Sequence, residues 1–501
     1  MFDLDVSEVD SVHVRVECDK HTALELSDHF SFKIPGYRFM PAYRSRMWNG
    51  EIKLYNIHTQ LIYSGLVDYI KKFADDRQYT ISTPAQNGFV TSEEDVRKFV
   101  EDFLNIHVNG TKIAPHEHQT KAIRYAMEKE RCLLLSPTGS GKSLIIYALI
   151  RYYLSKLPSS RKILIVVPTV SLVEQLYSDF DDYSSENGWD VSANCHKILA
   201  GANKITDKRV VISTWQSIYK QNDKYFDQFG AVVGDEAHQF KAKSLISIMG
   251  KLKRCSYRVG TTGTLDGTNT HKLVLEGLFG RVYEVTKTKE LMEKKILSNL
   301  KIDCLLLSYP DLDRKSVVRA KYQDEIKWIV SSKRRNKFIA DLCNKLKGNT
   351  LVLFQLVENH GKILHTMVES CVSKPRKVFF VYGGTEATER EDIRKIVETE
   401  TDAIIVASYG TFSTGISIRR LNNIVFASPS KSRIRVLQSI GRQLRIANDK
   451  TVARLYDLGD DLSWKSWKNH TLRHMGERLR LYEAEGFDHK LVKIELGDKD
   501  A

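Results

Sequence analysis

The stretch that decides the fold of this chain is Ser136-Pro137-Thr138-Gly139-Ser140-Gly141-Lys142-Ser143. It lies between the apolar run 132–135 and the apolar-periodic stretch 144–154, so the sequence predicts a strand, a loop and a helix. Small residues allow the backbone N–H groups of such a loop to wrap around a triphosphate. Lys142 can reach the β- and γ-phosphates, and the Ser143 hydroxyl is placed to bind Mg²⁺. The sequence therefore predicts that residues 136–143 bind a nucleotide, with the N-terminus of the following helix favouring the same anion.

The loop departs from the general phosphate-loop pattern at its first position, where Ser136 stands in place of Gly. An ordinary glycine-rich turn between a strand and a helix is the alternative interpretation. The choice between the two depends on the rest of the chain.

Length and charge limit what the protein can be. A chain of 501 residues is too long for one hydrophobic core and suggests about three domains. The formal net charge of +14 favours a polyanionic partner such as nucleic acid, because a positive surface field raises the local concentration of phosphates. A modestly basic enzyme is the alternative.

The seven cysteines are scattered and never spaced C-x-x-C, which predicts reduced thiols with neither a disulfide framework nor a zinc site. The first residues do not resemble a secretory signal, and no apolar segment approaches the length of a membrane span. We therefore expect a soluble cytoplasmic protein, located in the host cytoplasm if the chain is encoded by a phage.

A pair of carboxylates follows a second apolar strand. Asp235-Glu236-Ala237-His238 comes directly after the run 231–234, about 90 residues beyond the loop. An aspartate at a strand end can hold the Mg²⁺ that bridges the β- and γ-phosphates, and an adjacent carboxylate can orient and deprotonate the attacking water. We expect Asp235 and Glu236 to act with Lys142 in ATP hydrolysis.

From Pro115 onward these motifs resemble those of the superfamily 2 DEAH-box helicases. The resemblance implies that Gln119 contacts the adenine and that the loop residues 136–143 bind the phosphates. It implies nucleic-acid contacts for six residues, namely Pro168, Thr169, Thr214, Gln216, Thr414 and Gly415. It implies coupling of hydrolysis to movement for five, namely His238, Thr262, Gly263, Thr264 and Gln438.

The segment Gln438-Ser439-Ile440-Gly441-Arg442-Gln443-Leu444-Arg445 matches the Q-x-x-G-R-x-x-R motif of the same superfamily. On a helix, Arg442 and Arg445 would share one face and could reach one triphosphate. An arginine supplied from the opposite lobe stabilises charge on the transferring phosphoryl group and is worth roughly 10³ to 10⁵ in rate. Both arginines are therefore predicted to be catalytic.

Two series of short apolar strands, the first within 132–260 and the second within 350–458, alternate with helical patterns and indicate two parallel sheets. We expect an α/β fold of two tandem RecA-like lobes, preceded by a small α+β domain. The expected boundaries are 1–110 for a small nucleic-acid-binding domain, 111–285 for the ATP-binding lobe, 286–460 for the second lobe and 461–501 for a helical tail packed on it.

Residues 30–55 interleave aromatic and basic side chains. Aromatic faces beside guanidinium groups suit a nucleic-acid platform, but the same aromatics could form the core of the small domain. The runs 32–39 and 48–55 also resemble bacteriophage recombination and repair helicases. That resemblance implies ATP-driven remodelling of branched DNA: fork regression, Holliday-junction branch migration and unwinding of RNA–DNA hybrids.

The expected ligands are ATP, Mg²⁺ and DNA, either branched or single-stranded, with RNA–DNA hybrids as further substrates. We expect a monomer without membrane contact, with single-strand-binding or recombination proteins as candidate partners. Three alternatives are a DEAH-type RNA helicase, a double-stranded-DNA translocase that does not separate strands, and a nucleic-acid-binding or annealing protein with a degenerate ATPase. The last is disfavoured because Lys142, Asp235, Glu236, Arg442 and Arg445 are all present.

Overall fold

The computed structural model describes residues 2–84, 90–199, 201–240, 242–265, 267–415, 418, 420–429, 432–444 and 452–497, without the side chains of residues 269, 270, 387, 413–415, 433, 434 and 442. The chain forms two compact units, Met1–Ser136 with Gly141–Val285, and Pro137–Ser140 with Thr286–Ala501. Each is described by itself.

The first unit contains a seven-stranded sheet of order β11-β12-β10-β13-β14-β9-β15, in which every pair of neighbours is parallel. This sheet and the helices on it are called the first lobe below. Its strands are β9 (Arg131–Leu135), β10 (Lys162–Val167), β11 (Cys195–Ile198), β12 (Val210–Thr214), β13 (Phe229–Asp235), β14 (Tyr257–Thr262) and β15 (Val282–Glu284).

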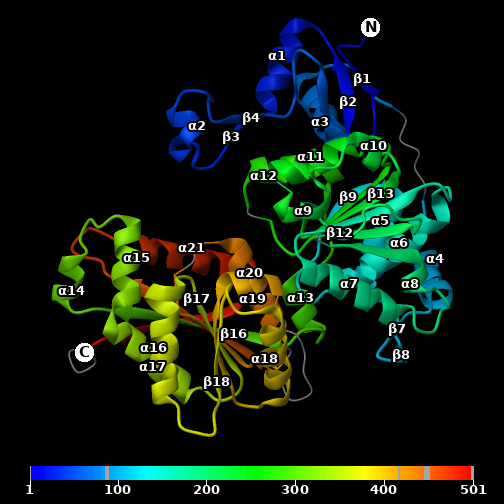
Figure 1. Ribbon diagram of the computed structural model, residues 1–501. Helices are drawn as coiled ribbons and strands as arrows, with labels where there is room; N and C mark the ends of the chain where they lie inside the picture. Colours follow the sequence, from blue (N-terminus) through cyan, green and yellow to red (C-terminus); the bar gives the residue numbers. More distant parts are fainter. Residues whose placement is uncertain are drawn as a thin grey trace. The chain divides into compact units, whose positions relative to one another are not determined.

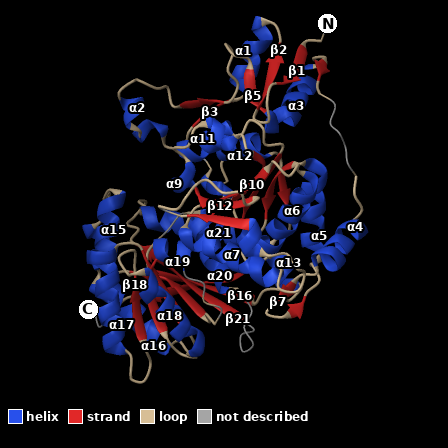
Figure 2. Ribbon diagram, turned by 45° about the vertical axis from the view of Figure 1, so that its right-hand side comes forward, coloured by secondary structure: helices blue, strands red, loops and turns tan. Residues whose placement is uncertain are grey.

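Alternate residues of these strands pack into two different hydrophobic cores, because successive side chains point to opposite faces of a sheet. In β9, Leu133 belongs to one core, whereas Cys132 and Leu134 belong to the other. Both faces are therefore covered, which explains why the strands are continuously apolar in sequence. Figures 1 and 2 show the helices on the two sides. They are α4 (Glu93–Lys98), α5 (Glu117–Lys129), α6 (Lys142–Lys156), α7 (Val170–Tyr183), α8 (Val191–Asn194), α9 (Trp215–Ile218), α10 (Asp223–Phe226), α11 (Lys243–Lys251) and α12 (Asn269–Phe279).

The N-terminal module, residues 2–84, has a small sheet of order β5-β2-β1-β6. Its elements are β1 (Leu4–Glu8), β2 (His13–Glu17), α1 (Lys20–His29), β5 (Leu61–Tyr63), α3 (Val67–Arg77) and β6 (Ile81–Ser82). The Tyr69 hydroxyl donates to Glu276 Oε2 of α12 at 2.7 Å, and the Ser11 N–H donates to the Lys253 carbonyl at 2.9 Å. The module is thus hydrogen-bonded to the first lobe.

Residues 31–53 form an arm that leaves the module, as Figure 1 shows. The arm consists of the antiparallel pair β3 (Ser31–Lys33) and β4 (Glu51–Lys53), with the helical turns η1 (Tyr37–Phe39) and α2 (Pro41–Arg44) between them. The core interpretation of the aromatic–basic run applies to the residues that flank the arm, and the nucleic-acid interpretation stays a prediction for the arm itself. Phe30 and Tyr55, which flank the arm, are buried in the module core, whereas Phe39 and Met47 are 76% and 80% exposed.

The segment 93–106 packs on the first lobe rather than on the N-terminal module. Val96, Val100, Leu104 and Ile106 belong to the core that α5 and α6 build, and a π-helical turn, η3 (Phe99–Leu104), continues α4. The expected boundary at residue 110 therefore does not follow the packing. Helical periodicity shows that a face is buried but not which core buries it.

The second unit contains another seven-stranded parallel sheet, of order β18-β19-β17-β20-β21-β16-β22. Its strands are β16 (Asn299–Ser308), β17 (Thr350–Phe354), β18 (Val378–Val381), β19 (Ile404–Ser408), β20 (Asn423–Phe426), β21 (Val452–Asp461) and β22 (Asp488–Glu495). Its helices are α13 (Thr288–Glu293), α14 (Asp311–Ser316), α15 (Tyr322–Ser331), α16 (Lys333–Lys345), α17 (Lys362–Cys371), α18 (Ala387–Thr399), α19 (Tyr409–Gly415), α20 (Arg433–Gln443) and α21 (His470–Ala484). Two parallel sheets covered by helices are the predicted pair of RecA-like lobes.

The tail differs from the predicted helical segment. It forms α21 and also the edge strand β22, which pairs with β16. The run Asp488–Glu495 mixes charged and apolar residues on the open edge of the sheet without regular alternation, so it carries a weak apolar signal. Glu325 is fully buried and accepts the backbone N–H groups of His470 and Thr471 at 2.9 and 2.8 Å, which fixes the N-terminus of α21.

Within the described ranges, no helix is long and apolar enough to cross a bilayer.

Asp460 forms a fully buried ion pair in the second unit. Its Oδ1 accepts Arg335 Nε at 2.7 Å and the Tyr309 hydroxyl at 2.7 Å, and neither member of the ion pair has exposed side-chain surface. Replacing one member of such a pair leaves the other charge buried without compensation.

We predict that Asp460→Ala lowers the free energy of unfolding by about 3–5 kcal/mol, measured by urea denaturation with tryptophan fluorescence. Asp311→Ala is the matched control, because Asp311 is 64% exposed and pairs with Arg314 at the surface. It should cost less than about 1 kcal/mol. Equal losses for the two variants would contradict the role assigned to the buried pair.

Candidate functional site

The strand order of the first lobe brings two groups of side chains to one sheet edge. Strands β13, β14 and β9 are neighbours, and β11, β12 and β10 follow on the other side of β13. Because all are parallel, the loops after their carboxyl ends meet at the same edge, where ligands of open α/β sheets bind. The phosphate-loop motif follows β9 and Asp235 ends β13, whereas Pro168 follows β10 and Thr214 ends β12.

The loop after β9 has the backbone shape of a phosphate cradle. Gly139 and Gly141 have φ angles of +86° and +83°, which only glycine adopts without strain. The Ser136 N–H donates to the Thr262 carbonyl at 2.8 Å, and Lys142 Nζ donates to the Ser136 carbonyl at 3.2 Å. Ser136 does not occur among the described residues with positive φ, so its position does not require glycine.

Gln119 lies against this loop. Its Oε1 accepts the His116 N–H at 2.8 Å in the capping box of α5. Its Nε2 is 2.1 Å from the point that a Cβ on Gly141 would occupy, so a larger residue at position 141 would displace the Gln119 amide. The residue expected to contact adenine is therefore next to the loop expected to hold the phosphates.

Asp235 and Glu236 are brought to the same place by β13. Asp235 is buried, and its Oδ1 accepts the Thr261 hydroxyl at 2.6 Å. Burial raises the pKa of the Asp235 carboxyl, the neighbouring Glu236 raises it further, and Lys142 lowers it. Glu236 has a φ of +52°, so the chain turns sharply directly after the strand. The carboxylates of Asp235 and Glu236 and the ammonium group of Lys142 thus lie close together at a site that is partly shielded from solvent.

His238 connects this acidic turn to the end of β14. Its Nδ1 lies 3.1 Å from Thr262 Oγ1 and 3.3 Å from Glu236 Oε2. The Thr262 hydroxyl in turn donates to the Thr264 carbonyl at 3.0 Å. Three of the residues expected to couple hydrolysis to movement therefore form one chain of contacts, with Gly263 between Thr262 and Thr264 in sequence.

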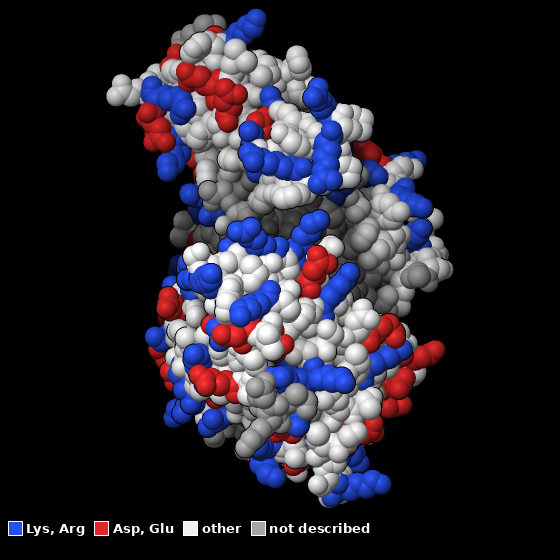
Figure 3. Space-filling view, turned by 90° about the vertical axis from the view of Figure 1, so that its left-hand side faces the viewer, with Lys and Arg blue, Asp and Glu red and all other residues white. Residues whose placement is uncertain are grey.

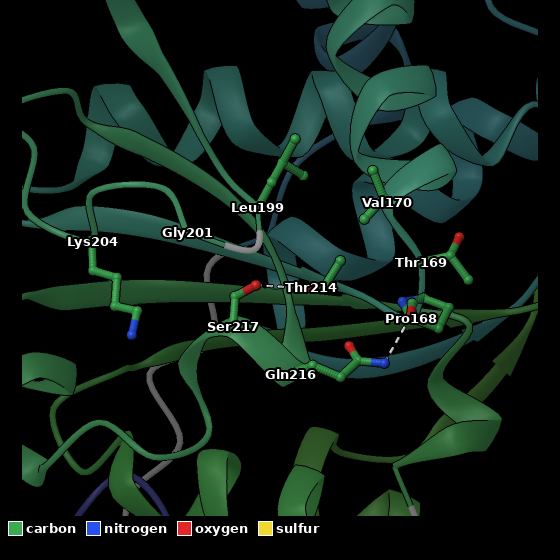
Figure 4. Close-up of a pocket in the computed structure, with 9 residues that line it drawn as sticks. All are labelled: Pro168, Thr169, Val170, Leu199, Gly201, Lys204, Thr214, Gln216 and Ser217. Carbon is green, nitrogen blue, oxygen red and sulfur yellow. Dashed lines mark hydrogen bonds between the residues drawn. The ribbon is translucent and has the colours of Figure 1, made fainter. Parts of the chain in front are cut away.

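A second site lies beside the first, in a pocket of about 540 Å³ that Figure 4 shows. Gln216 Nε2 donates to the Pro168 carbonyl at 3.4 Å, and the hydroxyls of Thr214 and Ser217 are 2.9 Å apart. The structure brings together all four first-lobe residues expected to contact nucleic acid. The lining residues are Pro168, Thr169, Val170, Leu199, Gly201, Lys204, Thr214, Gln216 and Ser217.

Sequence reasoning missed three members of this pocket, Leu199, Gly201 and Lys204. They lie on the segment between β11 and β12, whose turn-forming sequence Gly201-Ala202-Asn203 could have marked a loop at the carboxyl edge of the sheet. Among the described residues, no hydrogen bond or ion pair of the Lys204 ammonium group is found, and Figure 4 shows its side chain at the rim of the pocket. The group is therefore available for a phosphate.

The second unit holds the other predicted residues. Thr414 and Gly415 end α19, and Gln438 and Arg442 lie on α20. The side chains of Thr414 and Arg442 are not part of the description, and Arg445 lies outside the described residues. Near the start of α19, the hydroxyls of Ser408 and Thr411 are 2.8 Å apart.

Three family models match the chain. They are "DNA helicase UvsW, N-terminal" at residues 3–84, "Type III restriction enzyme, res subunit" at 112–267 and "Helicase conserved C-terminal domain" at 334–447. Together they cover the N-terminal module and parts of both units.

Individual proteins agree with these models. The ATP-dependent DNA helicase uvsW of Enterobacteria phage T4 is 36% identical over 514 residues, covering 99% of this chain and 100% of the relative. The crystal structure of T4 UvsW matches with a TM-score of 0.53 at 35% identity, over 99% of this chain and 100% of that one. A fragment of a putative HsdR subunit of a type I restriction enzyme from Vibrio vulnificus YJ016 shares the fold, with a TM-score of 0.58 at 17% identity over 85% and 74% of the two chains.

The fold and the site define a superfamily 2 helicase, an enzyme that uses ATP to unwind nucleic acid. More narrowly, the chain belongs to the UvsW family of ATP-dependent DNA helicases, since the T4 relative matches it over its full length.

The pocket yields a prediction for Lys204. Lys204→Ala should weaken single-stranded DNA binding and lower the slope of log K against log[salt] by about 0.7, because one phosphate contact is lost. Fluorescence anisotropy titrations at several salt concentrations measure both quantities.

Lys156→Ala is the control, because Lys156 ends α6 and does not line the pocket. An unchanged salt slope for Lys204→Ala would contradict the phosphate contact.

Proposed function

We propose that the chain is an ATP- and Mg²⁺-dependent helicase that remodels branched DNA: it regresses forks, migrates Holliday junctions and unwinds RNA–DNA hybrids in recombination, repair and replication. The observation that carries the branched substrate is the arm of the N-terminal module. Its apolar tip is exposed beside basic side chains, on a module that is hydrogen-bonded to the ATP-binding lobe.

In the proposed ATP site, Gln119 reads the adenine and residues 136–143 surround the phosphates. Lys142 places a positive charge on the β- and γ-phosphates, where negative charge builds up during phosphoryl transfer. Glu236 orients the attacking water and accepts its proton. The support is that the buried Asp235 interacts electrostatically with the half-buried Lys142 and Glu236.

Ser143 and Asp235 would hold Mg²⁺. Their donors are a hydroxyl and a carboxylate, the hard oxygen ligands that this cation prefers, and a dication would relieve the repulsion between Asp235 and Glu236. When bound, Mg²⁺ would neutralise charge on the phosphates.

Arg442 and Arg445 of the second unit complete the proposal. Their support is the Q-x-x-G-R-x-x-R motif alone: they would stabilise the transferring phosphoryl group and so make hydrolysis depend on both lobes. Thr414 and Gly415 would contact the nucleic acid from the same unit, and Gln438 would take part in coupling.

We assign the pocket of Figure 4 to the phosphates of one DNA strand. Hydroxyl, amide and ammonium groups of Thr169, Thr214, Gln216 and Lys204 suit a grip that does not depend on base sequence. The contacts from Glu236 through His238 to Thr262 and Thr264 run from the turn after β13 to the end of β14, and we propose that they couple hydrolysis to movement.

At the tip of the arm, Phe39 would stack on an unpaired base at a branch point, since base–aromatic stacking does not depend on sequence, and the thioether of Met47 would pack beside it. Tyr37 and Tyr43 pack edge to face with ring centroids 4.8 Å apart, and this contact joins η1 to α2 at the tip of the arm. Arg38, Arg44 and Arg46 would contact the flanking phosphates.

The overall charge fits a DNA partner. The chain carries a formal net charge of +14, and on the face drawn in Figure 3 Lys and Arg side chains are spread over both units, with Asp and Glu among them. A field of this sign speeds association with DNA and makes it salt-dependent. Single-strand-binding or recombination proteins are candidate partners, and we expect the enzyme to act as a monomer.

We predict that Lys142→Ala lowers kcat for ATP hydrolysis by about 10²–10³-fold, the usual effect of removing one charge-stabilising group. DNA affinity should stay within about twofold of wild type, because Lys142 does not line the pocket of Figure 4, which is formed by residues after β10, β11 and β12. A coupled ATPase assay and anisotropy titrations measure the two effects. Undiminished hydrolysis would contradict the site.

For the arm, the double variant Phe39→Ser with Met47→Ser should bind a four-way junction about tenfold more weakly, an effect within the 1–3 kcal/mol range of base stacking. Its ATPase rate at saturating single-stranded DNA should stay within about twofold. Leu312→Ser is the matched control, because Leu312 is 80% exposed on the second unit. Unchanged junction affinity in the arm variant would show that the tip does not contact DNA.

A further inference from the structure

The hydroxyl of Ser143 has a partner that the proposed chemistry does not use. Tyr183, the last residue of α7, places its phenol oxygen 2.9 Å from Ser143 Oγ at the start of α6. These two residues lie 40 positions apart in the chain and meet because α6 and α7 pack side by side on one face of the first-lobe sheet.

Several contacts fix the position of Tyr183. Its ring packs edge to face on Tyr147, one turn after Ser143 on α6, with ring centroids 5.5 Å apart. Asn187 Nδ2 donates to the Tyr147 hydroxyl at 3.0 Å and to the Tyr183 carbonyl at 3.4 Å. These contacts fix both the ring and the backbone of Tyr183, so its phenol oxygen has a defined position beside Ser143.

A serine that binds a cation through a lone pair keeps its proton, and this proton needs an acceptor on the side away from the cation. Residues that hydrogen-bond to metal ligands orient them and are often nearly as important as the ligands. We propose that Tyr183 is a positioning residue for Ser143, accepting the proton of its hydroxyl so that a lone pair of Oγ faces the Mg²⁺ of a bound nucleotide. This inference rests on the proposed role of Ser143.

The same helix connects this contact to the DNA pocket. Thr169 caps the N-terminus of α7, and Thr169 and Val170 line the pocket, as Figure 4 shows. With 14 residues and a rise of about 1.5 Å per residue, α7 spans roughly 21 Å from the pocket to Tyr183. A single rigid element thus joins the proposed DNA grip to the orientation of a cation ligand.

The test is the gain in nucleotide affinity that Mg²⁺ provides. Isothermal titration calorimetry of a non-hydrolysable ATP analogue, with EDTA and with Mg²⁺, gives two Kd values, and their ratio is the magnesium gain. Tyr183→Phe keeps the ring that packs on Tyr147 and removes only the hydroxyl. We expect it to reduce the magnesium gain about tenfold, as removal of a residue behind a metal ligand does, and to leave the Kd in EDTA within about twofold.

Two further variants separate the possible outcomes. Tyr177→Phe, on the same helix, should leave both Kd values unchanged, and Ser143→Ala should lose the magnesium gain. If Ser143→Ala loses the gain and Tyr183→Phe keeps it, Tyr183 does not position Ser143 and this inference fails while the proposed site stands. If Ser143→Ala keeps the gain, the assignment of Ser143 to Mg²⁺ fails and the inference fails with it.

Discussion

The site depends on the electrostatic interactions of the buried Asp235 carboxylate with Glu236 and Lys142. Burial and the neighbouring Glu236 both raise its pKa, and only the Lys142 charge and the hydrogen bonds from the Thr261 hydroxyl and the Glu236 backbone act in the opposite direction. Such a corner holds two carboxylates at a cost, because like charges with little water between them repel. On the proposed function, a divalent cation bound with the nucleotide would place positive charge beside these two carboxylates and relieve their repulsion.

The order of strands in one parallel sheet explains why the proposed hydrolytic site and the proposed DNA-binding pocket are neighbours. Strand β13 carries Asp235 and lies between β14 and β10, so the residues expected to bind ATP are on one side of it and the pocket of Figure 4 is on the other. Helix α7 connects the two groups, because Thr169 at its N-terminus lines the pocket and Tyr183 at its end contacts Ser143. The contacts of His238 with Glu236 and Thr262 stay at the ends of β13 and β14. A small shift of α7 would move residues at both of its ends, because close-packed protein interiors transmit strain.

The sequence was sufficient to predict the two parallel sheets, the glycine-containing loop between β9 and α6 and the position of Lys142 near Asp235 and Glu236. These features rest on local signals: continuous apolar strands, glycines at fixed spacing and carboxylates at a strand end. The sequence also drew attention to the aromatic–basic run 30–55, but it could not show which of its aromatic side chains are buried. Burial of Tyr55 and exposure of Phe39 depend on where the core of the module ends. Edge strand β22, Lys204 and Tyr183 were not predictable, because an edge strand carries little apolar pattern and the other two matter only through residues distant in sequence.

The central claim is that ATP hydrolysis in this chain serves branched DNA. The most direct measurement is the ATPase rate titrated with single-stranded DNA, duplex DNA, a four-way junction and RNA at one fixed salt concentration, since phosphate contacts make every such affinity salt-dependent. The proposed function predicts half-maximal stimulation at the lowest concentration for the four-way junction, and weaker stimulation by RNA than by either form of DNA. Stimulation by RNA equal to or stronger than that by the junction would contradict it.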